Sequence, residues 1–299
     1  MNGRQEWERV RRGERGLEKS MKLLNLKTLF LNKGIREVIP IVLIIPSIIF
    51  LTVFIVGSLI SLLFYVGNIS YTFVEIVFRA DFQTAYLRTL RVALIVALIT
   101  TTLAYPVAFY VLHMSYKMRQ IMKALIWLPV MINPIVRGYG WMIILGRLGL
   151  VNTILLVLGI INEPIKLLYT ELAMIFGLTE LFFPFMFISL LSAMENISDE
   201  TIMAAYSLGA NTFRVFKDIV MPLSIKGYVF GVTIVVTGCS TAFTTPTLLG
   251  GPQNATLSML LAEYVSILLD WRKACAIALI ILATVLAISE LASVIVKKR

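Results

Sequence analysis

The apolar residues of this chain gather in six long stretches, and short polar segments separate them. A helix needs roughly 20 apolar residues to cross the hydrocarbon core of a bilayer, and each stretch is long enough. No stretch alternates strictly between apolar and polar residues, so helices rather than β-strands are the expected spanning elements. The six predicted spans cover residues 38–66, 90–113, 121–145, 168–194, 225–244 and 274–296.

Two further segments lie outside these spans. Residues 150–161 are apolar but too short to cross, so we expect a helix that lies in or dips into the outer interface. In the basic tail, positions 17–31 suit either a helix on the cytoplasmic membrane face or a solvated segment. The basic start and the span after it are too long for a cleavable signal, and Met21 is a second candidate start. We therefore expect a tail, 1–37, and one membrane domain, 38–299.

The composition supports an integral membrane protein. Of the 299 residues, 59% are hydrophobic and 15% are charged, and the mean hydropathy is +0.88. Soluble domains are about half apolar and about a quarter charged. The net charge of +10 does not indicate nucleic-acid binding, because the basic residues flank apolar stretches and no recognition fold accompanies them. Cys239 and Cys275 lie inside predicted spans, without the spacing of a metal or redox site.

The basic residues also predict the orientation of the chain in the membrane. With both termini inside, nineteen Lys and Arg side chains fall on inner segments or the adjoining span ends, seven on outer segments or the adjoining span ends, and one, Arg137, lies deeper within a span. Inner segments of membrane proteins are enriched in Lys and Arg. We therefore expect both termini, and the polar segment 198–222, to lie in the cytoplasm.

Segment 198–222 is polar, yet it is patterned as two short helices between the fourth and fifth spans. Ser198 can cap the first helix, and Asp199 and Glu200 complement its positive N-terminal end. Gly209 can take the left-handed conformation that ends a helix, because it has no side chain to clash.

The second helix of this segment has Asn211 or Thr212 as its expected cap. Phe213, Phe216 and Val220 follow at i, i+3 and i+7, a spacing that predicts one shared helix face. A plain helical hairpin on the membrane surface would carry the same features, so the pattern alone leaves its role open.

A motif of fixed spacing runs through the segment: Met203-Ala204-Ala205, three residues, Gly209, nine residues, Ile219, one residue and Met221-Pro222. It resembles the EAA loop of permease subunits of bacterial ABC importers, which has Glu-Ala-Ala, Gly, Ile and Leu-Pro at the same spacing. Two positions depart from that pattern, since Met203 stands in place of the Glu and Met221 in place of the Leu.

The resemblance implies an all-α permease of the bacterial inner membrane with six transmembrane helices and the type I importer fold. In that family the loop docks into a groove on the ATPase and carries the mechanical stroke into the membrane. ATP and Mg therefore belong to the partner ATPase, and no cofactor is expected on this chain. The implied ATPase-coupling residues are Glu200, Met203, Ala204, Ala205, Gly209, Phe213, Phe216 and Pro222.

The resemblance also implies three partners: a cytoplasmic ABC ATPase dimer, a second permease subunit and an extracytoplasmic substrate-binding protein. A contact that the family makes through a carboxylate must come here from Met203, or from Glu200 one turn earlier. This departure favours a second permease that is not a copy of this chain.

Further segments look like the spermidine/putrescine-type branch of the family. They are 127–152 around Arg137-Gly-Tyr-Gly-Trp141, then Thr245-Pro-Thr-Leu-Leu-Gly-Gly-Pro252, and Leu269-Asp270-Trp271 before the last span. With the loop, the resemblance covers residues 85–290. A polyamine or similar small organic cation is the expected substrate. Relatives in this branch also move iron, opines, phosphonates and thiamine, so these stay alternatives.

The third predicted span contains two prolines and an arginine. Pro129 and Pro134 interrupt this span and free backbone carbonyls, which membranes tolerate where protein or a cavity covers them. Arg137 would cost roughly 2.5–3.5 kcal/mol at a lipid-facing helix centre, so it should face inward or pair, with Glu180 as candidate partner. A structural pair and a translocation role both fit. The candidate pathway residues are Arg137, Trp141, Glu180 and Phe183.

The segment after the fifth span predicts a stiff, turning outer loop or a re-entrant connector, because it combines Pro246 with Gly250-Gly251-Pro252. In the resembling family this region faces the binding protein and the outer gate. The implied residues are Pro246, Gly250, Gly251 and Asp270.

Other classes of protein lack support in the sequence. The chain has neither a Gly-x-x-x-x-Gly-Lys-Ser/Thr phosphate loop nor a His-Glu-x-x-His metal motif, so we do not expect an enzyme or a metal site. An ion-coupled secondary transporter would call for inverted repeats, which are not apparent. An intramembrane enzyme is disfavoured because the single histidine, His113, has no partner at catalytic spacing.

Overall fold

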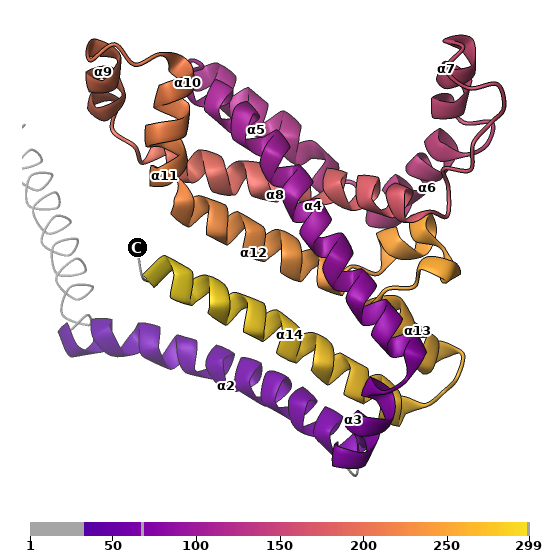
Figure 1. The fold of residues 1–299 in the computed structure, drawn as a ribbon. Helices are drawn as coiled ribbons and strands as arrows, with labels where there is room; N and C mark the ends of the chain where they lie inside the picture. Colours follow the sequence, from indigo (N-terminus) through magenta and orange to yellow (C-terminus); the bar gives the residue numbers. More distant parts are fainter. Residues whose placement is uncertain (1–32, 67–68, 298–299) are drawn as a thin grey trace, which may run out of the picture. The chain divides into compact units, whose positions relative to one another are not determined.

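The computed structural model describes residues 33–66 and 69–297, with side chains from Ile44 to Val66 and from Tyr71 to Lys297. Every regular element in this part of the chain is a helix (Figure 1). The predicted interfacial helix at 17–31 lies outside the described residues. The chain divides into two units, 1–64 and 65–299.

The first unit consists of most of α2, Lys33–Val66. Within α2, Ile44–Val66 is an apolar stretch of 23 residues, which is long enough to cross a bilayer. The predicted first span, 38–66, is thus a single helix.

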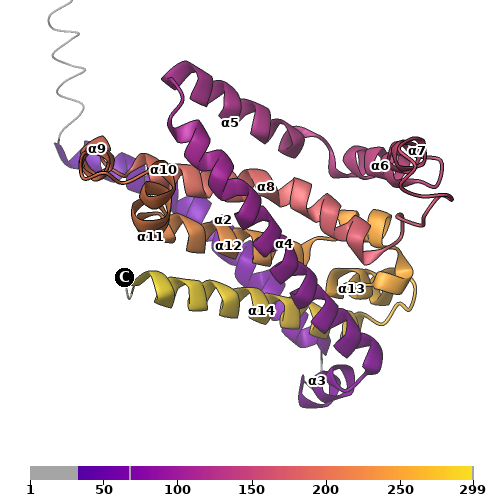
Figure 2. The same ribbon diagram turned by 45° about the horizontal axis from the view of Figure 1, so that its top comes forward.

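The centre of the second unit is α8, Glu171–Glu195, which packs against α4, Ala80–Leu112, and α12, Ile225–Thr241 (Figures 1 and 2). Two thirds of the apolar window of α8 is buried, with Met186, Phe187 and Leu190 fully enclosed. The predicted spans at 168–194 and 90–113 therefore match helices, although α4 begins well before residue 90.

Glycines let α8 and α12 approach closely. A Cβ added at Gly227 would lie 2.4 Å from the Cβ of Ala193 and 2.5 Å from the carbonyl oxygen of Ser189. One added at Gly231 would lie 2.6 Å from the sulfur of Met186. Without a hydrophobic driving force in lipid, membrane helices associate through such small-residue contacts, so this pair of glycines fixes the α8–α12 packing.

The remaining long helix of this unit is α14, Trp271–Lys297, which runs beside α12. Two short helices pack on its N-terminal part: α3, Ile69–Val77, and α13, Leu257–Ser266 (Figure 1).

The interruption that the prolines predict in the third span, 121–145, is present in the structure. The chain forms α5, Tyr116–Met131, then leaves the helical conformation at Ile132, and restarts as α6, Pro134–Leu145. Proline disfavours the helical conformation in the residue before it, and Asn133 instead caps α6 by accepting a hydrogen bond from the Ile135 N–H at 2.9 Å. The short apolar segment becomes α7, Leu150–Val157.

The number of spans differs from a simple count of apolar stretches. Five helical stretches in the described residues are long and apolar enough to cross, and one of them, Pro134–Val157, joins α6 and α7. A sixth results if Thr212–Leu223 and Ile225–Thr241 count as one span, although they meet at a bend of 69°. The expectation of six therefore stays a prediction.

Candidate functional site

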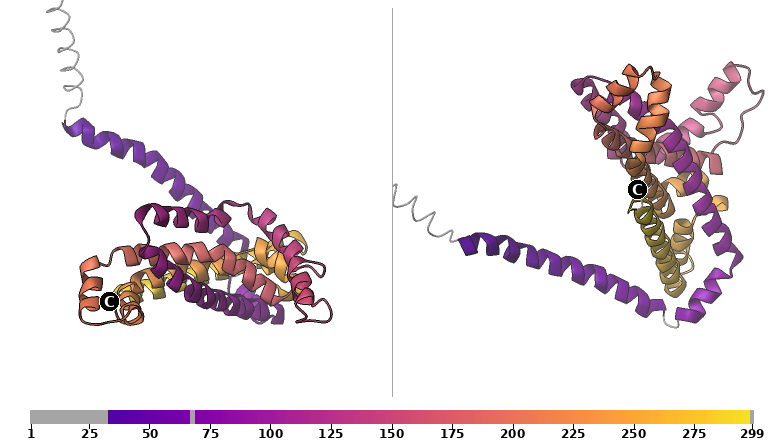
Figure 3. Two further views of the ribbon diagram at one scale, coloured as in Figure 1. Left: turned by 90° about the horizontal axis from the view of Figure 1, so that it is seen from above. Right: turned by 60° about the vertical axis from the view of Figure 1, so that its left-hand side comes forward.

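The segment predicted to couple to an ATPase lies at one end of the second unit, beside the C-terminal end of α8. Here α9, Asp199–Ser207, and α10, Thr212–Arg214, project beyond the ends of α4 and α8 (Figures 1 and 3). We call this the loop end; α6, α13 and the start of α14 lie at the opposite end.

The first helix of the loop has the predicted start and stop. The Ser198 hydroxyl accepts a hydrogen bond from the Thr201 N–H at 3.4 Å. At the other end, Gly209 has φ +84°, its N–H bonds to the carbonyl of Tyr206 at 2.9 Å, and the Ala210 N–H bonds to that of Ala205 at 3.0 Å. This pair of bonds is the Schellman motif, so the prediction that Gly209 ends the helix is confirmed.

The two faces of α9 have different surroundings. Ile202 and Ala205 are buried in the main core of the unit. On the other side, Glu200 and Ala204 are exposed, and Met203 is 67% exposed. One face of α9 therefore holds the helix to the bundle while the other stays free.

The second helix departs from the prediction. Asn211 caps it as expected, accepting from the Arg214 N–H at 2.9 Å. However, α10 continues as a π-helix, η1, Val215–Val220, whose wider turn shifts the side chains around the axis. Phe213 is 69% exposed, while Val220 is fully buried and Phe216 packs against the same core, so Phe213 does not share a face with the other two.

Phe216 connects the loop to α4. Its ring lies edge-on to Phe109, with centroids 5.1 Å apart, and to Tyr105 at 6.0 Å. The exposed Pro222 is the second residue of α11, Met221–Leu223, which ends just before the bend into α12. Packed side chains therefore connect the loop to α4, and the chain leads directly from the loop into α12.

An ion-pair cluster at the loop end was not expected from the sequence. Glu195, the last residue of α8, lies 2.8 Å from Lys123 Nζ and 3.4 Å from Arg119 Nη1. Arg119 also donates to the Leu112 carbonyl at the end of α4. A carboxylate at a helix C-terminus is unfavourable for the helix dipole, and this was the signal in the sequence that it needs a basic partner.

Arg137 and Glu180 form the predicted pair. Arg137 Nε lies 3.1 Å from Glu180 Oε2, and the two side chains are 8% and 25% exposed. Arg137 Nη1 donates to the carbonyl of Pro129 at 3.1 Å, across the break between α5 and α6. The expected inward orientation of Arg137 is thus confirmed.

The other two candidate pathway residues lie near this pair. Trp141, one turn after Arg137 on α6, lies close to the Glu180 carboxylate and packs on Leu145 and Leu249. Phe183 is half-buried and stacks on Phe187, with centroids 6.3 Å apart. A role in the pathway stays a prediction for all four.

The outer loop is largely buried within the subunit. Pro246–Gly250 forms a π-helix, η2, seated on α8, and a Cβ added at Gly177 would lie 2.4 Å from Leu249. Gly251, with φ +71°, lies against Tyr169. Pro246, Gly250 and Gly251 are buried within the described chain, and their exposed neighbours are Pro252 and Gln253. A role of these residues at the outer gate or in contact with a binding protein stays a prediction.

Asp270 has a structural role at the opposite end. Its carboxylate accepts from the backbone N–H of Lys273 at 3.1 Å and thereby caps α14. The Lys273 ammonium lies 3.4 Å from Asp270 and 2.8 Å from Glu75, which ties α14 to α3. A gate role for Asp270 stays a prediction.

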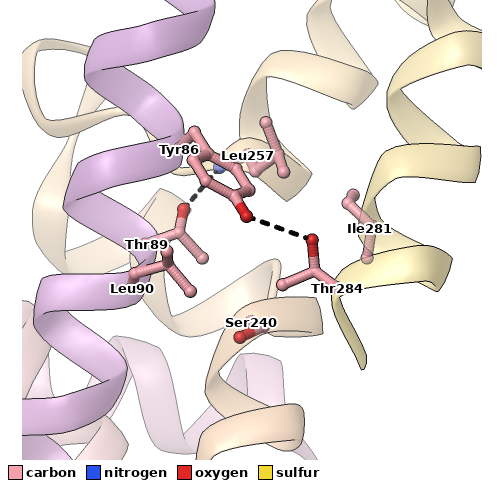
Figure 4. A pocket seen from close by; sticks show the side chains of 7 residues that line it. All are labelled: Tyr86, Thr89, Leu90, Ser240, Leu257, Ile281 and Thr284. Atoms are coloured by element: carbon pink, nitrogen blue, oxygen red, sulfur yellow. Dashed lines mark hydrogen bonds between the residues drawn. The ribbon is translucent and has the colours of Figure 1, made fainter. Parts of the chain in front are cut away.

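A small cavity between α4, α12, α13 and α14 was also missed by the sequence patterns (Figure 4). Its hydroxyls already interact: the Tyr86 and Thr284 oxygens are 3.4 Å apart, and Thr89 accepts from the Leu257 N–H at 2.9 Å. At about 10 Å³ it has room for about one water, so it is too small for an organic substrate. The lining residues are Tyr86, Thr89, Leu90, Ser240, Leu257, Ile281 and Thr284.

Within the residues that the structure describes, no group of three or more His, Cys, Asp or Glu side chains could hold a metal ion.

Known proteins place this architecture in a family. No protein-family model matches the chain. It is 31% identical over 209 residues to the spermidine/putrescine transport system permease protein PotB of Escherichia coli K12, which covers 67% of this chain and 76% of that protein. The chain belongs to the ABC-transporter permeases. It is a transport subunit of the spermidine/putrescine-type branch, all-α, with several apolar spans.

Further matches of this permease agree with that assignment. It is 38% identical over 157 residues to PotB of Haemophilus influenzae, covering 52% of this chain and only 55% of the relative. Two crystal structures of bacterial alginate ABC transporters share its fold. Their chains superpose with TM-scores of 0.75 and 0.77 at 19% and 18% identity, and cover 88% and 89% of the permease.

Proposed function

We propose that this permease is one of two membrane subunits of a binding-protein-dependent importer, and that it moves a polyamine or similar small organic cation. The observation that carries the substrate is the identity of 31% and 38% to two permeases named for spermidine and putrescine. The paired carboxylate of Glu180 inside the membrane domain agrees with a cationic substrate.

The loop end is the proposed contact with a cytoplasmic ATPase dimer. Three apolar side chains project there without cover from the described chain: Met203 at 67%, Leu208 at 89% and Phe213 at 69% exposure. Exposed apolar side chains at one end of a subunit favour a protein partner there. Because Met203 replaces a carboxylate of the family motif, the contact is apolar at this position.

The anchors on the other side of the loop would turn this contact into motion. Ile202 and Ala205 fasten α9 to the core, and Phe216 fastens the second helix to α4. Closure of the ATPase dimer on ATP and Mg would then shift the bundle as a rigid body between inward- and outward-facing states. This chain itself would bind neither ATP nor Mg.

The rest of the assembly follows from the same proposal. An extracytoplasmic binding protein would deliver the substrate, and a second permease, not identical to this one, would complete the pathway. The chain would lie in the bacterial inner membrane with both termini in the cytoplasm. This orientation places nineteen basic residues on the cytoplasmic side and seven on the outer side.

Purification in mild detergent with a C-terminal tag tests the assembly, and reconstituted uptake tests the substrate. Mass spectrometry should find an ATPase and a second permease with the chain. Proteoliposomes of that complex, supplied with its binding protein and internal ATP, should accumulate labelled spermidine. A chain recovered alone, or a complex that does not take up spermidine, would contradict the proposal.

A further inference from the structure

The central helix α8 has one open side, and it is not purely apolar. Most of the helix is enclosed by α4 and α12, but Leu172, Phe176, Glu180 and Phe183 remain partly accessible. They follow one another at i, i+4, i+8 and i+11, so they form one stripe along the helix. We call these four residues the open stripe of α8.

The middle of the open stripe is a carboxylate between two aromatic rings. Phe176, one turn before Glu180, is 56% exposed, and Phe183 is half-buried one turn after it. Phenyl faces attract cations, most strongly where water is excluded. A carboxylate flanked by such rings is suited to an ammonium group.

The ion pair with Arg137 leaves some polar atoms of both side chains without an aligned hydrogen bond. Arg137 Nε is 3.1 Å from Glu180 Oε2, but Oε2 has no aligned hydrogen-bond donor within the described chain. The Arg137 side chain is 8% exposed, and its Nη2 likewise lacks an acceptor. The hydroxyl of the neighbouring Thr179 is a third buried group without a partner.

Arg137 has a second acceptor that does not depend on Glu180. Its Nη1 donates to the Pro129 carbonyl at 3.1 Å, at the helix break between α5 and α6. If Glu180 exchanged partners, the guanidinium would keep this hydrogen bond. The carboxylate, in contrast, has no other basic side chain near it in the ion pairs of the described chain.

An ionised pair inside a membrane domain is expensive in contact with lipid, and such pairs almost always face the protein interior or a water-filled cavity. The open stripe should therefore face the pathway rather than the lipid. α6, which carries Arg137, lies beside the N-terminal half of α8 (Figures 1 and 2).

We propose that Glu180 is a transient binding site for an ammonium group of the substrate during its passage. Arg137 occupies the carboxylate at rest and yields to the arriving cation while it stays bonded to the Pro129 carbonyl. Phe176 and Phe183 flank the ammonium group above and below. This inference rests on the proposed function, because it requires a cationic substrate.

Transport by the reconstituted complex tests the site. Spermidine moved per ATP hydrolysed is measured for the wild type and for Glu180→Gln, with Glu171→Gln as matched control. Glu171 is also a carboxylate on α8 paired with an arginine, Arg91. We expect Glu180→Gln to lower the ratio about tenfold, as for the loss of one charge-assisted hydrogen bond, and Glu171→Gln to leave it unchanged.

A double variant separates transport from folding. If the pair serves structure alone, Glu180→Gln/Arg137→Gln removes the unpaired charge and should restore both assembly and transport. The proposal predicts restored assembly with transport still low. If Glu180→Gln alone does not assemble, transport by the double variant is measured in its place.

The outcomes distinguish the two proposals. No spermidine uptake by the wild-type complex would overturn the proposed function and this inference with it. Uptake by the wild type that Glu180→Gln leaves undiminished, or that the double variant fully restores, would overturn the inference alone.

Discussion

Replacing Gly209 should break the coupling between the permease and its ATPase without unfolding the permease. Gly209 has φ +84°, and a Cβ at this position would meet no atom within 4 Å. A substitution therefore strains only the backbone. A non-glycine residue in the left-handed region costs about 1–2 kcal/mol, and a β-branched one more.

That cost acts on the end of α9 rather than on the core. A strain of about 1–2 kcal/mol lowers the population of the correctly ended helix about 5–30-fold relative to distorted forms. The core helices α4, α8 and α12 do not contain this residue. We therefore expect Gly209→Val to assemble normally and to melt like the wild type.

The assay compares uptake of spermidine with ATP hydrolysis stimulated by the loaded binding protein, in proteoliposomes. Gly209→Val should lose most of both, while Gly209→Asn should retain them, because asparagine tolerates the left-handed region. Equal activity of the two variants would refute the reasoning, and so would a Gly209→Val protein that fails to assemble.

Three further predictions concern packing and the loop anchors. Gly227→Ala should destabilise the folded permease by about 1–3 kcal/mol through overpacking against α8, measured as a lower Tm in detergent. Gly140→Ala should leave the Tm unchanged, because no atom lies within 4 Å of a Cβ at that position; equal Tm values of the two variants would contradict the glycine contact. Phe216→Ala should lower the unfolding free energy by about 2 kcal/mol, because this ring packs against the core. Phe213→Ala changes an exposed side chain, so it should keep the Tm and weaken ATPase binding in a pull-down assay. The reverse pattern would refute the assignment of faces. Glu195→Gln should lower the unfolding free energy by about 1 kcal/mol or less, and a larger loss in thermal melts would show that its ion pairs are worth more than partly exposed pairs usually are.

Much of the helical architecture was predictable because spans and caps depend on local chemistry. Long apolar runs must be helical in a bilayer, since no water satisfies their backbone groups. The stop at Gly209 and the cap at Asn211 depend on neighbouring residues alone, and both are confirmed. The inward orientation of Arg137 followed from the cost of a charge in lipid.

The features that the sequence did not predict depend instead on packing between distant segments. The pattern i, i+3, i+7 assumes an α-helix, but η1 is a π-helix, so Phe213 and Val220 separate. The burial of Gly250 and Gly251 depends on η2 seating against α8, which no local pattern reports. Glu195 was overlooked because its basic partners come from α5.

The break of the third span was predictable in part. Its proline signal was visible at Pro134, yet only the structure places the interruption at Ile132 and Asn133. The consequence could not be seen from the sequence: the break positions the Pro129 carbonyl as a second acceptor for Arg137.

The measurement that tests the central claim most directly is crosslinking from the loop end in the native membrane. A photoreactive residue placed at Met203, which is 67% exposed, should yield an adduct with an ABC ATPase, identified by mass spectrometry. The same residue at Gln253, exposed near the opposite end, should not. An ATPase adduct at Gln253, or none at Met203 in a complex that contains the ATPase, would contradict coupling through residues 198–222.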